Sequence, residues 1–475
     1  MKKFLSIIAV ALIALGLASC GGGKDEGIVL TYAAWNLGVE GSPKPNMERM
    51  MLDAFEEAHP GVTVEVIERP KEPGTDNDQG WNEFLRTKAS VGQLPDVFMA
   101  DNIPYYIIGD WTLKLNDLVA NDPEYAKISA DIKDTAKYDG KIFALPSAVH
   151  YYGYVVNEDL YEDQGQTAPT VTSTLEEVLA ATRAAAVHTG NTQQGVAGFE
   201  GIEHILHWYP AQLNPDLGWF TFDGEKFNLD GAEFTAAVDL YRQLQTSPEY
   251  VLEALQWESN QENTTVNFNE IFATQDFFNN GNILCKWFAS NDLGWVQTKI
   301  DSGEYTWDLN FIGTPVVNGN KVNPSVIDFL TIASTTEHPN EAYELAKWMG
   351  FGKDGYLKRI ELSNTVTGID KVNFAPVQND SQLLDEYFKI YSSFTGLRKI
   401  IEDGNFVVEP PKYQVGYAKV RYEGMFDADN KMFDIINQLM AGEVAIADIK
   451  TQLNSKANAL YQDAKKELNA VLPSR

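Results

Sequence analysis

The sequence predicts an α/β protein whose N-terminal part forms a largely parallel sheet. The apolar, β-prone run 28–35 is followed by an amphipathic helical pattern over 47–58. Two further strands are predicted at 62–67 and 96–100, with a helix at 81–90 between them. This strand–helix–strand–helix–strand alternation is typical of a parallel α/β sheet.

The residues of each segment account for its predicted structure. Segment 28–35 is apolar and β-prone, with Thr31 as its one polar residue, as in a buried strand. Apolar residues of segment 47–58 recur at helical spacing, and His59-Pro60-Gly61 ends the helix because proline cannot continue it. Segment 62–67 is β-branched with polar interruptions, which predicts a strand with one exposed face.

Helical patterns continue through the rest of the chain. Pro339-Asn340 marks the start of one of these helices. We find no internal repeat. The further helices are predicted at 175–188, 234–245, 272–279, 341–349, 431–440 and 446–468.

The start of the chain has the features of a secretory signal. Lys2 and Lys3 precede an apolar stretch that is too short to span a membrane. The following Leu17-Ala18-Ser19-Cys20 resembles the lipobox of bacterial lipoproteins, in which the cysteine carries diacylglycerol. This resemblance implies a signal peptide at 1–19, a lipidated tether at 20–27 and membrane attachment through Cys20. An ordinary signal peptide with a chance cysteine is the alternative.

Composition limits the classes of function. The chain has 475 residues, enough for two or three domains, and a formal charge of −30. Such acidity argues against nucleic acid and anionic membrane surfaces as partners, and says little about a neutral ligand. Two cysteines exclude a disulfide scaffold, and Cys285 is expected to be a buried, small apolar residue.

Common catalytic motifs are absent from the sequence. There is no Gly-x-Ser-x-Gly elbow, Walker loop, His-Glu-x-x-His motif or Gly-rich dinucleotide turn. His204 and His207, with Glu203, have a spacing that could hold a metal, but a polar contact role is the simpler interpretation. We therefore predict no catalytic residues, no cofactor and no metal.

Five motifs occur in an order that resembles a known family. The motifs are Gly92–Val97, Tyr138–Pro146, Tyr152–Tyr161, Phe278–Asn282 and Ile332–Met349. The second of them, Tyr138–Pro146, predicts a hairpin that leads into a strand. In this order the motifs resemble the extracellular solute-binding proteins of carbohydrate ABC importers, the class that includes maltose-binding protein.

The resemblance implies a two-lobed periplasmic-binding-protein fold of type II, with the ligand in the cleft between the lobes. The chain is expected to cross between lobes near 148–151, 326–329 and 375–380. The expected N-terminal lobe comprises 28–148 and 328–378, and the C-terminal lobe 149–327 and 379–475. Clefts between domains are favoured ligand sites, and a ligand that contacts both lobes stabilises the closed form.

A sugar site needs flat aromatic rings for C–H faces and polar groups for hydroxyls. The chain has 10 Trp and 21 Tyr residues, several at predicted strand ends. The strand-end tryptophans could instead pack in a core, and the Asn and Asp residues could cap turns or, at 328, anchor the hinge. The candidate ligand-binding residues are Trp35, Asn36, Asp101, Asn102, His150, Tyr151, His204, Trp208, Trp287, Asn291, Asp292 and Asp328.

These features predict a monomeric, lipid-anchored substrate-binding protein outside the cytoplasm, either in the periplasm or on the outer cell surface. It would capture a sugar or oligosaccharide and deliver it to the permease subunits of an ABC importer, without chemistry. A polyol, peptide or glycosaminoglycan fragment is an alternative ligand, although the sparse Arg69, Lys71 and Arg86 do not form the basic cluster that acidic glycans need. A secreted carbohydrate-active enzyme with two catalytic carboxylates, or a surface adhesin, are alternatives from other classes.

Overall fold

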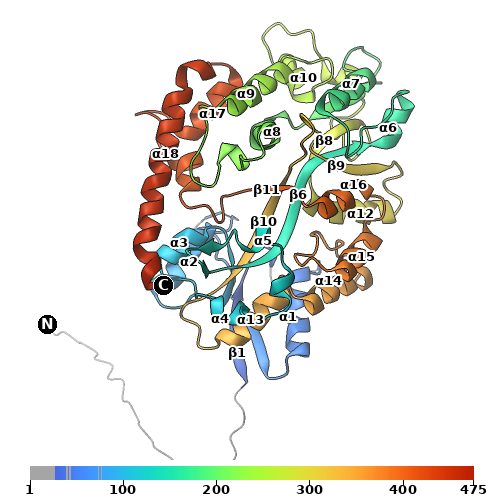
Figure 1. The fold of residues 1–475 in the computed structure, drawn as a ribbon. Coiled ribbons are helices and arrows are strands. Elements are labelled where there is room, and N and C mark those ends of the chain that lie inside the picture. The colour runs from blue at the N-terminus through green and yellow to red at the C-terminus, as the bar shows by residue number, and fades with distance from the viewer. Residues whose placement is uncertain (1–26, 39–40, 42–43, 73, 76) are drawn as a thin grey trace, which may run out of the picture.

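The computed structural model describes residues 27–38, 41, 44–72, 74–75 and 77–475. The predicted signal peptide, Cys20 and most of the tether lie outside the described residues. Within the described part of the chain, no helix has the length and apolar character needed to cross a membrane. The protein is built around a mixed β-sheet with helices on its faces (Figure 1).

The principal sheet has nine strands, ordered β2-β1-β3-β10-β6-β8-β7, with β11 beside β10 and β9 beside β6. β1 pairs in parallel with both β2 and β3, as the sequence predicts. β10 is antiparallel to β3 and β6, so the sheet as a whole is mixed rather than largely parallel. The strand bounds are β1 Ile28–Ala33, β2 Val62–Val66, β3 Val97–Ala100, β6 Leu145–Asn157, β7 Ala197–Glu200, β8 Ile283–Ala289, β9 Leu309–Gly313, β10 Asn323–Ile332 and β11 Phe406–Val408.

The longest strand, β6, has 13 residues and joins the two halves of the sheet. It follows the predicted hairpin, which consists of β4 (Lys137–Tyr138) and β5 (Lys141–Ile142). The first part of β6 pairs with β10, and the part from Tyr152 onward pairs with β8 and β9. Gly153 permits close packing there, because a Cβ atom at this position would lie 2.3 Å from the Cα of Gly313.

Most predicted helices are confirmed, but the one at 272–279 is wrong. The chain instead forms the short helix α11, Phe268–Ile271, and continues through turns to Gly281, which has a φ of 65°. Phe272 and Phe277 both pack into a small separate core, which an irregular path allows. The longer helices are α1 Met47–Ala58, α2 Trp81–Ser90, α7 Leu175–Ala185, α8 Ile205–Leu213, α9 Ala232–Gln245, α10 Leu252–Ser259, α12 Leu293–Asp301, α13 Pro339–Met349, α14 Lys353–Thr365, α15 Ser381–Ile390, α16 Thr395–Asp403, α17 Met432–Ala441 and α18 Ile446–Val471. The shorter α3 spans Ile103–Ile108.

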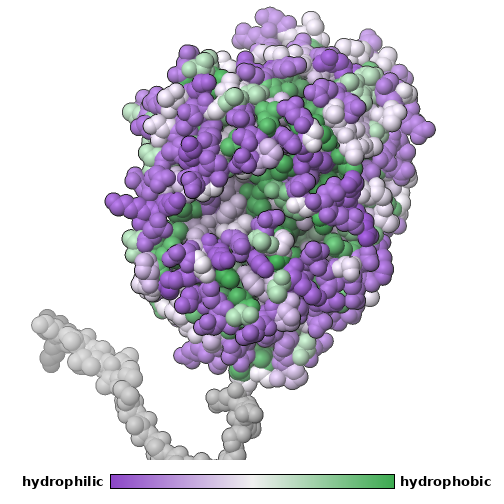
Figure 2. Space-filling view, viewed as in Figure 1, coloured by the Kyte–Doolittle hydropathy of each residue, from purple (hydrophilic) through white to green (hydrophobic). Residues whose placement is uncertain are grey.

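Two large hydrophobic cores lie in the described part of the protein. By the predicted boundaries, the first core extends from the N-terminal (first) lobe into the C-terminal (second) lobe, where it includes Phe288, Leu383 and Leu397. The first core surrounds β1, β3 and β10, and the second lies among α8, α9 and α17. Helix α18 contributes Leu453 and Tyr461 to the second core and Leu468 to the first, so it runs along both cores (Figure 1). Hydrophilic residues cover most of the face shown in Figure 2, with apolar residues grouped near its centre.

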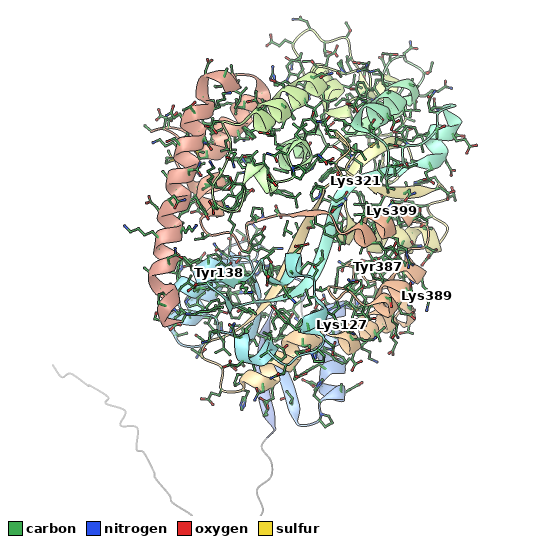
Figure 3. The ribbon with its side chains drawn as sticks, in the orientation of Figure 1. Lys127, Tyr138, Lys321, Tyr387, Lys389 and Lys399 are labelled. Carbon is green, nitrogen blue, oxygen red and sulfur yellow. The ribbon has the colours of Figure 1, made fainter. Side chains whose placement is uncertain are left out.

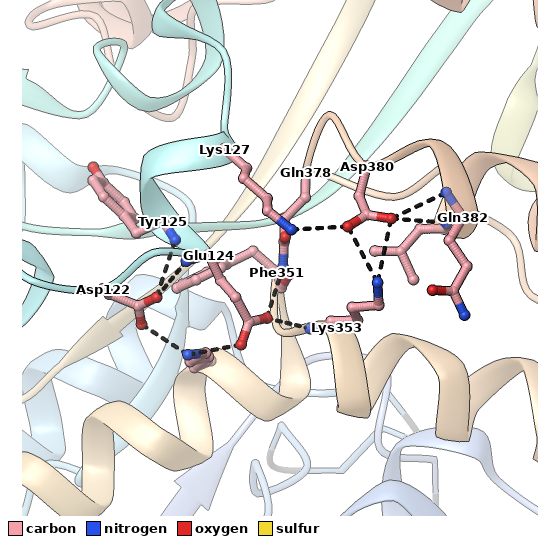
Figure 4. A network of polar contacts seen from close by, with 11 residues as sticks. Asp122, Glu124, Tyr125, Lys127, Phe351, Lys353, Gln378, Asp380 and Gln382 are labelled. Carbon is pink, nitrogen blue, oxygen red and sulfur yellow. Dashed lines mark hydrogen bonds and ion pairs between the residues drawn. The ribbon is translucent and has the colours of Figure 1, made fainter.

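A polar network ties the segment around residue 380 to helices α13 and α14 (Figure 4). Lys347 contacts Asp122 at 2.9 Å and Glu124 at 3.0 Å. Lys127 and Lys353 both contact Asp380, at 2.9 and 3.2 Å. Figure 3 shows Lys127 in the part of the molecule where Figure 1 labels α13 and α14. Hydrogen bonds from these two lysines lower the pKa of Asp380 to about 2. The network therefore fixes one end of the third predicted crossing.

A buried ion pair joins α1 to α14. Arg359 is 3% exposed, and its guanidinium donates to both carboxylate oxygens of Glu48, at 2.5 and 3.1 Å. Removal of one partner from such a pair leaves an uncompensated buried charge. Arg359→Met should therefore lower the free energy of unfolding by about 3–5 kcal/mol.

Lys358 provides the matched control, because it lies next to Arg359 on the same helix and its pair with Glu361 is exposed. Lys358→Met should change stability by less than about 1 kcal/mol. Urea unfolding of both variants measures the difference. Equal losses would show that the buried pair has no special role.

Candidate ligand-binding site

A pocket of about 310 Å³ opens where β1, β6 and β10 meet the loop after α14. Polar and aromatic side chains from all of these segments reach it. The lining residues are Tyr32, Trp35, Asn36, Glu48, Met99, Ser147, Ala148, His150, Tyr152, Asn291, Val326, Asp328, Leu330, Met349, Arg359, Asn373, Phe374 and Lys412.

Alternation along β6 determines which of its side chains reach the pocket. Successive residues of a strand point to opposite faces of the sheet. Ala148, His150 and Tyr152 line the pocket, whereas Tyr151 is buried on the other face with its ring 4.9 Å from that of Phe406.

Asp328, on β10, is the centre of a charged cluster in the pocket. Its carboxylate contacts Nε2 of His150 at 3.1 Å and also accepts a hydrogen bond from Lys412. Burial raises the pKa of Asp328, but the hydrogen bond with His150 and the charge of Lys412 outweigh it, so the pKa lies well below the usual range. Asp328 therefore stays ionised, and Lys412 balances its charge.

The pocket presents polar atoms without a net charge. The Glu48–Arg359 pair lies on one wall, and the Asp328–Lys412 pair lies on another. Within the described residues, Nδ1 of His150 is buried and has no hydrogen-bond partner. A buried polar atom of this kind gains free energy when a ligand supplies a partner. Paired charges and a free ring nitrogen suit an uncharged, hydrogen-bonding ligand.

Stacked rings extend from the pocket into the second lobe. The Tyr152 ring stacks on Trp287 with centroids 6.3 Å apart, and Trp287 stacks on His204 at 4.5 Å. Trp35, which lines the pocket, packs edge-on against Trp81 with ring centroids 5.4 Å apart. Flat rings beside polar groups are the two components that a sugar ring requires.

The structure brings together part of the predicted set. Trp287 and His204 adjoin the pocket through the ring stack, and Asp292 follows the lining residue Asn291. Burial raises the pKa of Asp292, whose carboxylate accepts a 3.4 Å hydrogen bond from Trp295. The predicted residues that line the pocket are Trp35, Asn36, His150, Asn291 and Asp328.

Other predicted residues lie away from the pocket. Tyr151 and Trp208 are buried in the two cores. Asp101 contacts Tyr106 and accepts a 2.9 Å hydrogen bond from Asn82, while Asn102 accepts from the backbone of Tyr105 at the start of α3. β3 thus leads directly into a capped helix, which turns both side chains from the pocket.

Among the lining residues that sequence reasoning missed are Tyr152, Asn373 and Lys412. The two-residue period of a strand could have identified Tyr152, because it shares a face with His150. Asn373 and Lys412 come from C-terminal segments that reach the pocket only through the tertiary fold, and no local motif marks them.

A buried carboxyl group lies behind the ring stack. Glu253 accepts hydrogen bonds from the backbone amides of Gly201 and Ile202, next to His204. Burial and the charge of Glu203 raise the pKa of Glu253 to about 7.

Within the described residues, no group of His, Cys, Asp or Glu side chains has the arrangement of a metal site. Cys285 is buried in β8, as predicted, and burial raises its pKa.

The mixed α/β fold is that of the two-lobed periplasmic-binding proteins, and its polar pocket lies beside the paired strands β6 and β10. The chain belongs to the bacterial extracellular solute-binding proteins, because the model of that family matches residues 40–351. The members of this family are binding proteins, and the family places the protein outside the cytoplasm.

Solved structures share this periplasmic-binding-protein fold. An open sugar transporter from Rhizobium etli has a TM-score of 0.65 at 15% identity, covering 91% of this chain and 99% of that chain. An ABC substrate-binding protein from Listeria monocytogenes, in complex with cycloalternan, has a TM-score of 0.62 at 16% identity over 92% and 99%. A solute-binding protein from Thermotoga lettingae, bound with α-D-tagatose, has a TM-score of 0.60 at 16% identity over 91% and 100%. No curated protein gives a significant sequence match.

The raised pKa of Glu253 predicts a pH dependence of stability. A carboxyl group whose pKa is higher in the folded state favours folding when protonated, and this contribution is lost as pH rises from about 4.5 through about 7. The free energy of unfolding should therefore fall between pH 5 and pH 8, and Glu253→Gln should reduce that fall.

Glu262, an exposed residue beyond the end of α10, supplies the control. Glu262→Gln should keep the wild-type pH dependence. Denaturant unfolding at several pH values gives the comparison. An unchanged slope in Glu253→Gln would mean that Glu253 titrates in the folded protein as it does in the unfolded chain.

Proposed function

We propose that the protein captures a neutral sugar or oligosaccharide in the pocket at β6 and β10, by lobe closure and without chemistry. The observation that carries this proposal is the combination of paired charges, the free Nδ1 of His150 and the adjoining ring stack of Tyr152 and Trp287. Charged ligands would require an unbalanced countercharge, whereas hydroxyl groups can both donate and accept hydrogen bonds.

The three predicted crossings pair with one another through backbone contacts, and this pairing supports a hinge there. Val149 pairs with Ile327 of β10 and forms a separate bridge with Ala375. Segments distant in sequence thus lie side by side next to the pocket. We propose that the lobes change over at 148/149, 327/328 and 378/379, so that small rotations there open and close the site.

The ligands of the structural neighbours agree with a carbohydrate cargo. The Listeria protein holds cycloalternan and the Thermotoga protein holds α-D-tagatose. At these identities the neighbours establish the fold alone, so they support the ligand class without identifying the sugar.

The proposal also covers the membrane anchor of the protein and the delivery of its ligand to a permease. The lipobox-like Leu17–Cys20 supports a lipid anchor on Cys20, and Gly21–Gly27 would serve as the tether. The protein would act as a monomer beside the permease subunits of an ABC importer. Mass spectrometry of the membrane-extracted mature protein would test the anchor, since an unmodified Cys20 would contradict it.

A thermal-shift screen tests the function. The protein without residues 1–26 is heated with monosaccharides, oligosaccharides, polyols and peptides at several concentrations. A ligand that binds the folded state raises the Tm in a concentration-dependent way. A shift with a sugar that is recovered intact supports the proposal. A shift with a sugar that is consumed would indicate an enzyme, and a shift with peptides alone would overturn the carbohydrate assignment.

Substitutions in the pocket should weaken binding of the sugar that the screen identifies. His150→Ala removes a buried hydrogen-bonding ring, and Asn291→Ala removes a polar side chain that lines the pocket. Loss of one ligand hydrogen bond costs about 1–3 kcal/mol, so Kd should rise by about 5- to 150-fold.

His338→Ala is the matched control, because His338 lies at the start of α13 and does not line the pocket. Its Kd should equal that of the wild type. Isothermal titration calorimetry of the three variants gives the values. Unchanged binding in both pocket variants would place the ligand elsewhere.

A further inference from the structure

A second cavity, of about 420 Å³, lies between the first lobe and helix α18. Asn82 of α2 and Tyr105 of α3 line one side of it, and Ala464 of α18 lines another. Lys412 lines the β6/β10 pocket, whereas Pro411 and Gln414, close to it in sequence, line this cavity. The two cavities share no lining residue, so they are separate sites.

Two buried polar atoms of this cavity have no partner within the described residues: Oδ1 of Asn82 and Nε2 of Gln414. Gln414 is 8% exposed. Asn82 donates its Nδ2 to Asp101 at 2.9 Å, which orients the amide so that Oδ1 is a free acceptor. Asn82 and Gln414 both line the cavity, and burial of this acceptor and this donor without partners is unfavourable.

The remaining lining is aromatic and apolar, with balanced charge at its edge. Tyr105 supplies a half-buried ring, which Trp111 holds edge-on with centroids 5.0 Å apart, whereas the ring of Tyr417 is buried in the second core. Lys419 forms a 3.7 Å ion pair with Glu467. Arg86 and Glu423, of opposite charge, also line the cavity, so the lining carries no net charge.

We propose that this cavity is a second binding site, for a neutral polyhydroxylated molecule the size of one sugar ring or a cyclic polyol. A hydroxyl group can donate to Asn82 and accept from Gln414, which an ion or a hydrocarbon cannot do. The Tyr105 ring provides a surface for the C–H face of such a molecule.

The location couples the second site to the arrangement of the lobes. Tyr105 packs against the first core and Tyr417 belongs to the second, while α18 contributes to both. The backbone amide of Ile103 also donates to the carbonyl oxygen of Lys412 at 2.8 Å, which links α3 to a segment that lines the β6/β10 pocket. An occupant that contacts both lobes favours one lobe arrangement, and therefore changes the affinity of the first pocket.

Ligand-observed NMR with glucose, myo-inositol and maltose as probes tests the proposal on the protein without residues 1–26. Four proteins are compared: the wild type and the variants Gln414→Leu, Asn291→Ala and Gln256→Leu. Gln256→Leu is the control, because Gln256 lies at an exposed position of α10. We expect glucose or myo-inositol to bind Asn291→Ala and Gln256→Leu with wild-type affinity at the second site, and Gln414→Leu at least ten-fold more weakly. If Gln414→Leu fails to fold, Asn82→Ala replaces it, with the same expected loss.

The outcomes separate this proposal from the proposed function. Binding that depends on Gln414 but not on Asn291 supports the second site, even if the β6/β10 pocket binds none of the probes. Binding that Asn291→Ala abolishes and Gln414→Leu leaves unchanged overturns the second site and leaves the proposed function intact. Absence of any Gln414-dependent binding would show that the cavity holds ordered water only, and would overturn the proposal.

Discussion

The continuous hydrogen bonding of β6 is the constraint on which the rest of the structure depends. One strand pairs with β10 in its first part and with β8 and β9 in its second, so both lobes share its backbone. The same strand positions His150 and Tyr152 on one face and Tyr151 on the other. A one-residue shift in register would exchange these faces, which explains why the pocket and the cores are specified together.

The protein as a whole is strongly acidic, whereas the charges that line its pocket occur in complementary pairs. The chain carries a formal charge of −30, yet the pocket contains the complementary pairs Asp328–Lys412 and Glu48–Arg359. Surface carboxylates are solvated at little cost, whereas a buried charge needs a partner. Pairing therefore leaves a polar but neutral cavity in an acidic protein, and this arrangement suits a ligand that is rich in hydroxyl groups.

Helix α18 adds a second connection between the lobes, distant from the crossing strands. Its first half packs in the second core, and near its end Leu468 joins the first core. The Arg475 side chain also donates to the carbonyl oxygen of Ile107 at 3.2 Å. Helix α18 therefore packs against both cores, and the cavity beneath it is lined by residues that pack in each of them.

The sequence by itself determined the local elements and their order. Helices α1 and α2, the strands near them and the hairpin before β6 follow from periodicity and stop signals, which depend on near neighbours. Tertiary structure alone decided the antiparallel insertion of β10, the absence of a helix at 272–279, and the contributions of Asn373 and Lys412 to the pocket. The reason is physical: helical and strand patterns arise from interactions between residues close in sequence. Sheet order and the composition of a pocket depend instead on contacts between segments far apart in sequence, and no local pattern encodes them.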